Sequence, residues 1–179
     1  MMASRTGSPE LMKSLNRSLI LELIRMHGPI SRAEIAKRLE LSPPTVSAIT
    51  RALIDEGLVL EVGKDYNSQG AGRKGILLKY NSSAGYVAGL YVGELELRAA
   101  IANLSGKIEY RHRQEISDPK RVDLQMVVRT LNETVASAGI DRRKLSAIGL
   151  AVSGVVDASN GKVLEARYLS SLNGIPLKR

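Results

Sequence analysis

The sequence contains no cysteine, no tryptophan and no phenylalanine among its 179 residues. The absence of cysteine excludes disulfides, thiolate-bound zinc and a thiol nucleophile, and it fits a reducing compartment. No apolar run approaches the ~20 residues that a transmembrane helix requires. The first residues also lack the long apolar segment of a secretory signal. Together these absences predict a soluble, cytoplasmic protein with no membrane partner.

The chain is basic, with a net charge of +8 and an isoelectric point near 9.9. A basic protein can bind polyanions, above all nucleic acid. Residues 1–80 carry 12 Lys and Arg against 8 Asp and Glu, and residues 81–179 carry 14 against 10. Because both parts have the same excess, charge alone does not indicate which part would meet such a partner. A generally basic surface is the alternative interpretation.

Two helices are expected before residue 41. Ser8-Pro9-Glu10 has the features of a helix start, because serine caps, proline is tolerated at the first position and an acid suits the positive end of the dipole. Gly28-Pro29 ends this helix, and Ser31 and Glu34 have the spacing of a capping box for the second. The apolar side chains expected to face the core are Leu11, Leu15, Leu19, Leu23 and Met26 with Ile20 and Ile24, then Ile35, Ala36 and Leu39.

A third helix is expected to begin abruptly in the stretch LSPPTVSAITRAL, residues 41–53. Ser42 can cap it, and Pro43 and Pro44 occupy the first turn, where their missing N–H groups cost little. One face of this helix carries Val46, Ile49 and Leu53. The opposite face is small and polar, which favours a helix that enters a groove; it contains Ser47, Ala48, Arg51 and Asp55, with Thr45 at its flank.

Two strands, 58–62 and 76–80, are expected after Gly57, joined by a polar, glycine-rich loop. Helix, helix, turn, helix and hairpin is the order of a winged helix-turn-helix, whose second motif helix enters the DNA major groove. A basic wing can reach phosphates or the minor groove. The sequence therefore predicts a DNA-binding domain over residues 1–80, with a three-helix bundle that packs against protein as the alternative. The expected DNA contacts are Ser42, Pro44, Thr45, Ser47, Ala48, Arg51, Arg73 and Lys74.

The loop also contains a G-x-G-x-x-G pattern, from Gly70 to Gly75. A dinucleotide site requires this pattern between a strand and a following helix. Because a strand follows here, no cofactor is expected at this position.

Residues 81–179 read as a mixed α/β domain. Three strands are expected at 85–93, 95–104 and 107–116, with a tight turn at Ser105-Gly106. The apolar run 145–152 is typical of a central strand covered on both faces. A helix is expected from Asp118-Pro119 to Gly139, with a buried stripe of Leu124, Val127, Val128, Leu131 and Val135.

The stretches GRKGILLKYNSSAGYVAGLYVG (72–93) and IGLAVSGVVDASNGKVLEA (148–166) resemble the ROK family. This family groups sugar-responsive repressors, unassigned reading frames and sugar kinases. The resemblance runs from about Leu15 to the C-terminus. It implies a partial actin-like (ribonuclease H-like) α/β domain over residues 81–179, and a transcriptional repressor that binds double-stranded DNA.

The chain departs from the kinases of this family at their phosphate loop. Their first strand ends in an Asp-x-Gly-x-Thr type loop, but here Tyr91 replaces the acid and Leu95 replaces the hydroxyl residue. Only Gly93 is kept, and Glu94 and Glu96 would repel phosphates. The family's catalytic Asp and its zinc motif of His and several Cys have no counterpart, and His27 and His112 read as ordinary surface or helix-end residues. No enzymatic activity, cofactor or metal site is therefore expected.

Two residues near the end of the apolar run could suggest chemistry. Ser153 lacks the flanking glycines of a nucleophile elbow, and no histidine partner is evident. Asp157 matches a common acid of the family, for which a turn-capping role is expected. A ROK-type sugar kinase or sugar-binding protein and a non-enzymatic oligomerisation module remain the alternative functions.

No further strand is expected beside the strand 145–152, so its edge would be open to another chain. A homodimer could cover this edge, residues 161–169 could fold back over it, or the chain could be a fragment. Paired half-sites in DNA also favour dimers. We expect a homodimer, and the sequence leaves open whether a sugar effector binds.

Overall fold

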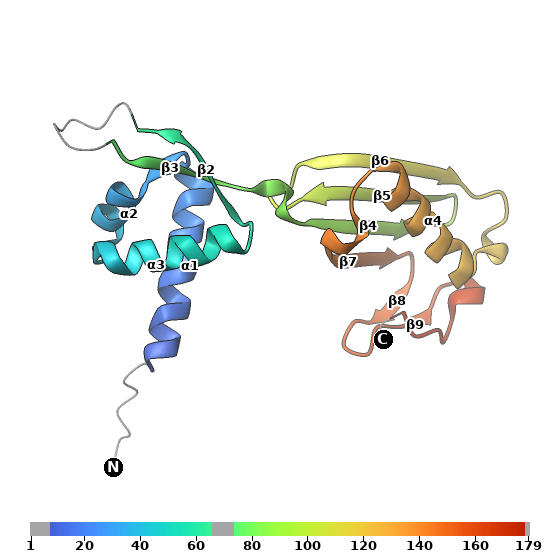
Figure 1. Cartoon of the computed structure of the whole chain (residues 1–179). Helices are drawn as coiled ribbons and strands as arrows, with labels where there is room; N and C mark the ends of the chain where they lie inside the picture. The colour runs from blue at the N-terminus through green and yellow to red at the C-terminus, as the bar shows by residue number, and fades with distance from the viewer. Residues whose placement is uncertain (1–7, 66–73, 178–179) are drawn as a thin grey trace, which may run out of the picture. The chain divides into compact units, whose positions relative to one another are not determined.

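The computed structural model describes residues 8–65 and 74–177, which form two compact units (Figure 1). The first unit ends at Asn81 and the second begins at Ser82. Each unit combines helices with a β-sheet, so the mixed α/β class expected from the sequence is confirmed. The elements of the first unit are α1 (Pro9–His27), β1 (Ile30–Ser31), α2 (Arg32–Leu39), α3 (Pro43–Asp55), β2 (Val59–Lys64) and β3 (Ile76–Tyr80).

The three helices and the small antiparallel sheet of the first unit enclose one apolar core. The sheet has the strand order β1-β3-β2, and β1, which the sequence did not indicate, pairs through Ile30 with Leu78. Burying one large aliphatic side chain stabilises a fold by about 1.5–3 kcal/mol, so the set as a whole dominates the stability of this unit. The most deeply buried members are Ile20, Ile24, Ile35, Val46, Leu53, Val59 and Leu78.

The start of α1 is as predicted, but its buried face is not. Ser8 Oγ accepts a hydrogen bond from the Leu11 amide at 3.2 Å. Of the expected stripe, Ile20 and Ile24 are buried and Leu23 is half-buried. The expectation was wrong for the remaining side chains of the stripe, which are exposed. Those exposed are Leu11, Leu15, Leu19 and Met26, together with Met12.

The second unit is built on a four-stranded sheet with the order β6-β5-β4-β7. Strands β4, β5 and β6 form an antiparallel meander, and β7 pairs parallel with β4 after the crossover through α4. Its elements are β4 (Tyr86–Val92), β5 (Glu96–Asn103), β6 (Ile108–Glu115), α4 (Leu124–Ser137), β7 (Leu145–Val152), β8 (Val155–Asp157) and β9 (Lys162–Glu165), with short 3-10 turns at Ser82–Ala84, Pro119–Arg121, Arg142–Lys144 and Ser170–Leu172.

The helix α4 lies across one face of this sheet (Figure 1). It begins at Leu124, later than expected, because the Asp123 carboxylate accepts the Met126 amide at 2.7 Å and caps it there. Asp118-Pro119 instead opens a single 3-10 turn. The expected stripe was partly wrong: Val127 and Val135 are buried and Leu131 is half-buried, whereas Leu124 and Val128 are exposed and Thr130 and Thr134 are buried in their place.

The strand β7 is not the central strand that its sequence suggested. Among the described residues it pairs only with β4, so it forms the edge of the sheet. Ile148 is 55% exposed and Leu150 is 37% exposed, and the main contacts of α4 with the sheet are to β4, β5 and β6. The alternative expectation of an open apolar edge therefore describes this strand.

Residues 161–169 do not fold back over that edge. Within this segment β9 pairs with β8. Val163, Ala166 and Leu169 are instead fully buried beside Leu90 and Val92 of β4. Residues 161–169 therefore pack into the core of the second unit, and no described strand pairs with the outer edge of β7.

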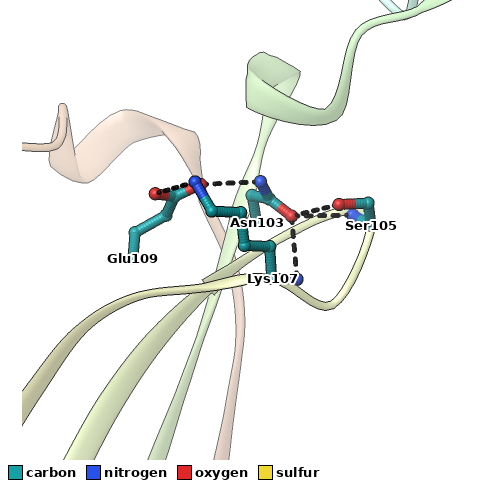
Figure 2. Close-up of polar contacts among 4 residues, drawn as sticks. All are labelled: Asn103, Ser105, Lys107 and Glu109. Atoms are coloured by element: carbon teal, nitrogen blue, oxygen red, sulfur yellow. Dashed lines mark hydrogen bonds and ion pairs between the residues drawn. The ribbon is translucent and has the colours of Figure 1, made fainter.

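The turn between β5 and β6 is fixed by one buried amide (Figure 2). Asn103 Oδ1 accepts hydrogen bonds from the Ser105 amide, the Ser105 hydroxyl and the Lys107 amide, at 2.7–3.1 Å. Its Nδ2 donates to Glu109 Oε1 at 2.8 Å. Gly106 completes the turn with a φ of 82°, a backbone conformation that favours glycine. The tight turn expected at Ser105-Gly106 is confirmed.

None of the helices over residues 8–65 and 74–177 is long and apolar enough to cross a membrane.

Candidate nucleic-acid interface

The start of α3 is determined by one serine and two prolines. Ser42 Oγ accepts the Thr45 amide at 3.3 Å, and its carbonyl accepts the Val46 amide at 3.1 Å. Pro43 and Pro44 have no N–H to satisfy. From Pro43 to Val46, each backbone N–H is therefore either absent or bonded to Ser42.

The face of α3 that the sequence assigned to DNA is exposed. Ser47, Ala48 and Arg51 are all exposed, and Thr45 at the flank is half-buried. The Thr45 hydroxyl lies 2.7 Å from the Ser42 hydroxyl. Among the residues that the structure describes, none forms a hydrogen bond or ion pair with the Arg51 side chain. Arg51 is thus available to a ligand outside the unit.

The opposite face of α3 anchors the helix in the core. Val46 and Leu53 are fully buried, and Ile49 is 6% exposed. Thr50 is fully buried as well, and its hydroxyl donates to the Ser47 carbonyl at 3.3 Å. Rigid backing of this kind is what a recognition helix needs, because a side chain that reads a base must be held in a fixed place.

Two arginines connect α3 to its neighbours, and neither was expected from the sequence. Arg32, the first residue of α2, donates from Nε to Thr50 Oγ1 at 3.0 Å and from Nη2 to Glu61 Oε1 at 2.8 Å. Arg17 of α1 forms an ion pair with Glu56 at the end of α3. These partners lie 18 to 39 residues apart in the chain, so no local sequence signal could have identified them.

The strands β2 and β3 form the base of a wing. Their register runs from Val59 opposite Tyr80 to Lys64 opposite Ile76, with an irregularity between Glu61 and Lys64. Gly63 lies in this irregularity with a φ of 138°, where a larger residue would be strained.

The predicted wing contacts are only partly described. Lys74 is exposed, as are Lys64 and Lys79 on the two strands. Arg73 and the tip of the loop lie outside the described residues. The described part of the wing thus carries several exposed cations.

In the second unit, the residues that the sequence analysis considered for chemistry form local polar contacts. Tyr91 Oη and Ser153 Oγ lie 3.0 Å apart, across the ends of β4 and β7. Asp157 accepts the amides of Ser159 and Asn160, both at 3.0 Å. The hydrogen bonds from Asn160, through its side chain and its backbone, lower the pKa of this carboxyl. Among residues 8–65 and 74–177 no cluster of His, Cys, Asp and Glu could hold a metal ion.

The first unit has three helices followed by a β-hairpin, and the third helix has a face of small, exposed side chains. This arrangement defines a winged helix-turn-helix domain. Residues 14–59 match the family model described as winged helix-turn-helix DNA-binding. The class of protein is therefore that of winged-helix DNA-binding proteins.

Similar proteins extend this assignment to the whole chain. A xylose repressor of Caldicellulosiruptor bescii is 31% identical over 175 residues, which cover 96% of this chain and 43% of the relative. The DNA-binding transcriptional dual regulator NagC of Escherichia coli K12 is 29% identical over 161 residues, which cover 89% of this chain and 39% of NagC. This chain thus spans less than half the length of these relatives.

A solved structure has the same architecture. It is described as a ROK family transcriptional regulator, homolog of the Escherichia coli MLC protein, and it superposes with a TM-score of 0.61 and 27% identity. The match covers 93% of this chain and 42% of that one. The resemblance to the ROK family inferred from the sequence is therefore confirmed.

Proposed function

We propose that this protein is a transcriptional repressor that binds double-stranded DNA through α3 and the β2–β3 wing. The observation that carries the proposal is the two-sided character of α3. Its back is buried through Val46, Ile49 and Leu53, while its front exposes small and polar side chains and Arg51, whose side chain has no partner among the described residues. Such a face fits the major groove, which admits an α-helix. The repressor names of the relatives support the same function.

The candidate contacts divide into two kinds. We expect Arg51, with Ser47 and Ala48 beside it, to approach base edges, because arginine can donate two hydrogen bonds to guanine. We expect Lys74 and the neighbouring wing cations to contact phosphates, which carry no sequence information directly. Ser42 and Pro44 shape the first turn and lie beside Thr45 at the entry of α3 into the groove.

The test uses a duplex selected by the wild-type chain from a random library, with a scrambled duplex as control. Arg51→Ala should reduce the preference for the selected duplex, whereas Lys74→Ala should weaken binding to both duplexes alike. The salt dependence of log K should also become shallower by about 0.9 for each phosphate that Lys74→Ala no longer neutralises. Equal losses on both duplexes in Arg51→Ala would contradict the base-reading role.

We also propose that the protein acts as a homodimer in the cytoplasm. Winged and other helix-turn-helix proteins commonly bind paired half-sites as dimers. The open edge of β7, with Ile148 and Leu150 exposed beside it, is a surface that a second copy could use. Sedimentation of the wild type and of Ile148→Lys would test this, since the charge should shift a dimer towards monomer. A sugar effector is compatible with the family, although no sugar site is proposed.

We further infer that the chain is not a sugar kinase. The position that resembles the kinase phosphate loop has Tyr91 bonded to Ser153 and the Glu94 carboxylate nearby, a setting that disfavours the phosphates of ATP. Phosphorylation of glucose or N-acetyl sugars above background would contradict this inference. A role purely in oligomerisation would be favoured instead if the chain failed to bind any duplex at about 50 mM salt, where cationic proteins bind DNA most readily.

A further inference from the structure

We propose that Arg32 is a positioning residue that sets the orientation of α3 relative to the wing. This inference rests on the proposed function, because the orientation matters only if both elements contact one DNA duplex. Arg32 begins α2, which itself carries none of the expected DNA contacts. Its side chain is 29% exposed and is committed to partners on two other elements.

The first partner lies at the centre of the recognition helix. Arg32 Nε donates to Thr50 Oγ1 at 3.0 Å, and this hydroxyl donates in turn to the Ser47 carbonyl at 3.3 Å. Thr50 is fully buried and lies next to Arg51 in the chain. The guanidinium is therefore connected through one buried hydroxyl to the turn of α3 that carries Ser47 and Arg51.

The second partner lies at the base of the wing. Arg32 Nη2 donates to Glu61 Oε1 at 2.8 Å. Glu61 pairs with Leu78, and the regular register of β2 ends immediately after it. Glu61 is thus the last regular position before the wing departs from the sheet, and a contact there controls the angle at which the wing leaves.

The shape of arginine makes this double contact possible. The planar guanidinium presents donors in a fixed fork, so bonds from Nε and Nη2 fix the directions of both partners at once. Lysine has one compact ammonium and cannot reproduce that geometry. Because one rigid group joins α3 to β2, losing it should let the two elements vary independently and weaken a ligand that must meet both.

The first experiment separates positioning from direct contact with DNA. Binding of the selected duplex is measured for the full chain and for Arg32→Ala, Thr50→Val and the double variant, under conditions where circular dichroism shows all four folded. Each single change should weaken binding by about tenfold and the double variant by little more, because residues that act as a unit are not additive. The salt dependence should stay unchanged, since the same phosphates are neutralised in every variant.

Conservative variants act as controls. Thr50→Ser keeps the hydroxyl and should bind almost as the wild type does. Arg32→Lys keeps the charge and should nevertheless lose affinity as Arg32→Ala does. Arg38→Ala removes another arginine of α2, whose Nε donates to Glu34 at 2.7 Å on the exposed surface, and should leave binding unchanged.

A second measurement needs no DNA and therefore distinguishes failure of this inference from failure of the proposed function. The chain has no cysteine, so spin labels can be placed through Ala52→Cys on α3 and Val62→Cys on β2, both at exposed positions. The distance distribution between the labels should broaden in Arg32→Ala and stay narrow in Arg38→Ala. The inference is overturned if the distribution is unchanged, or if Arg32→Ala lowers the salt dependence by about 0.9, which marks a phosphate contact.

Discussion

The hydroxyl groups of Ser42 and Thr45 lie 2.7 Å apart at the first turn of α3. The residue that caps the helix is therefore bonded, through both its side chain and its carbonyl, to the turn that would enter DNA first. Ser42 therefore both caps α3 and belongs to the expected DNA contacts. A variant at Ser42 must be designed to separate its effect on stability from its effect on DNA binding.

Ser42→Ala should lower the free energy of unfolding by about 1 kcal/mol, the usual effect of losing an N-cap side chain. Ser42→Asp should restore that stability, because aspartate caps as well as serine does. The added negative charge should nevertheless weaken DNA binding if this turn approaches phosphates. Urea unfolding and fluorescence anisotropy on both variants provide the measurements. If Ser42→Asp bound DNA as tightly as the wild type does, Ser42 would not be part of the interface.

Ile20 and Leu19 are neighbours on α1 with opposite environments. Ile20 is fully buried and Leu19 is 45% exposed. Ile20→Ala should destabilise the protein by about 2–5 kcal/mol, because it leaves a cavity in the core. Leu19→Ala should cost less than about 1 kcal/mol, as surface changes generally do. Chemical denaturation of the two variants compares them directly, and a similar cost for both would mean that the outer face of α1 is covered in solution.

Asn103 should be essential to the hairpin between β5 and β6. It is 4% exposed and makes four hydrogen bonds (Figure 2). Asn103→Ala should lower the free energy of unfolding by about 1–3 kcal/mol, since it removes the acceptor of three part-buried hydrogen bonds. Asn103→Asp keeps the acceptor but sets a carboxylate against Glu109, so it should be rescued by Glu109→Gln, whose amide can donate. Thermal melts of the single and double variants test this, and the absence of rescue would contradict the assigned bond to Glu109.

Glu96 should make part of the stability depend on pH. The hydrogen bond from Arg98 and the charge of Arg113, whose Nε lies 2.6 Å from Oε2, hold the pKa of Glu96 below its ordinary value, although partial burial opposes the shift. A carboxyl with a lowered folded pKa stabilises the protein above the unfolded pKa, about 4.3, and loses that contribution as the pH falls through the folded value.

Glu96→Gln removes this contribution. The difference in unfolding free energy between wild type and Glu96→Gln should therefore be largest near neutral pH and should shrink as the pH falls below about 4.3. In an Arg98→Gln background the difference should depend less on pH. Denaturant unfolding of both proteins between neutral pH and pH values below about 4.3 provides the measurement. If the difference in unfolding free energy grew on acidification, burial would affect the pKa of Glu96 more than the two arginines do.

The features predicted correctly from the sequence are those set by short-range chemistry. The caps Ser8, Ser31 and Ser42 lie three residues from the amides that they accept. The buried face of α3 follows from helical spacing alone, because Val46, Ile49 and Leu53 leave only one face for the core.

The errors have a common physical origin, since an apolar pattern identifies a face but not what covers it. On α1, the predicted stripe contained leucines at every fourth residue, but Ile20 and Ile24 are the buried members and Leu23 is the leucine that packs against their core. On β7, the apolar run is the same whether a strand is central or at an edge. The links from Arg32 join residues far apart in the chain, so only the folded structure reveals them.

The saturated first turn of α3 has a consequence for how the protein would search a genome. Helix ends with spare backbone donors attract any phosphate group, whatever the neighbouring bases. Here the two prolines lack this donor and Ser42 binds the amides of Thr45 and Val46, so the first turn of α3 has few backbone donors for the phosphates of an arbitrary sequence. Dwell times on wrong sites would then be set mainly by side chains, and brief visits there favour rapid sampling before the correct operator is reached.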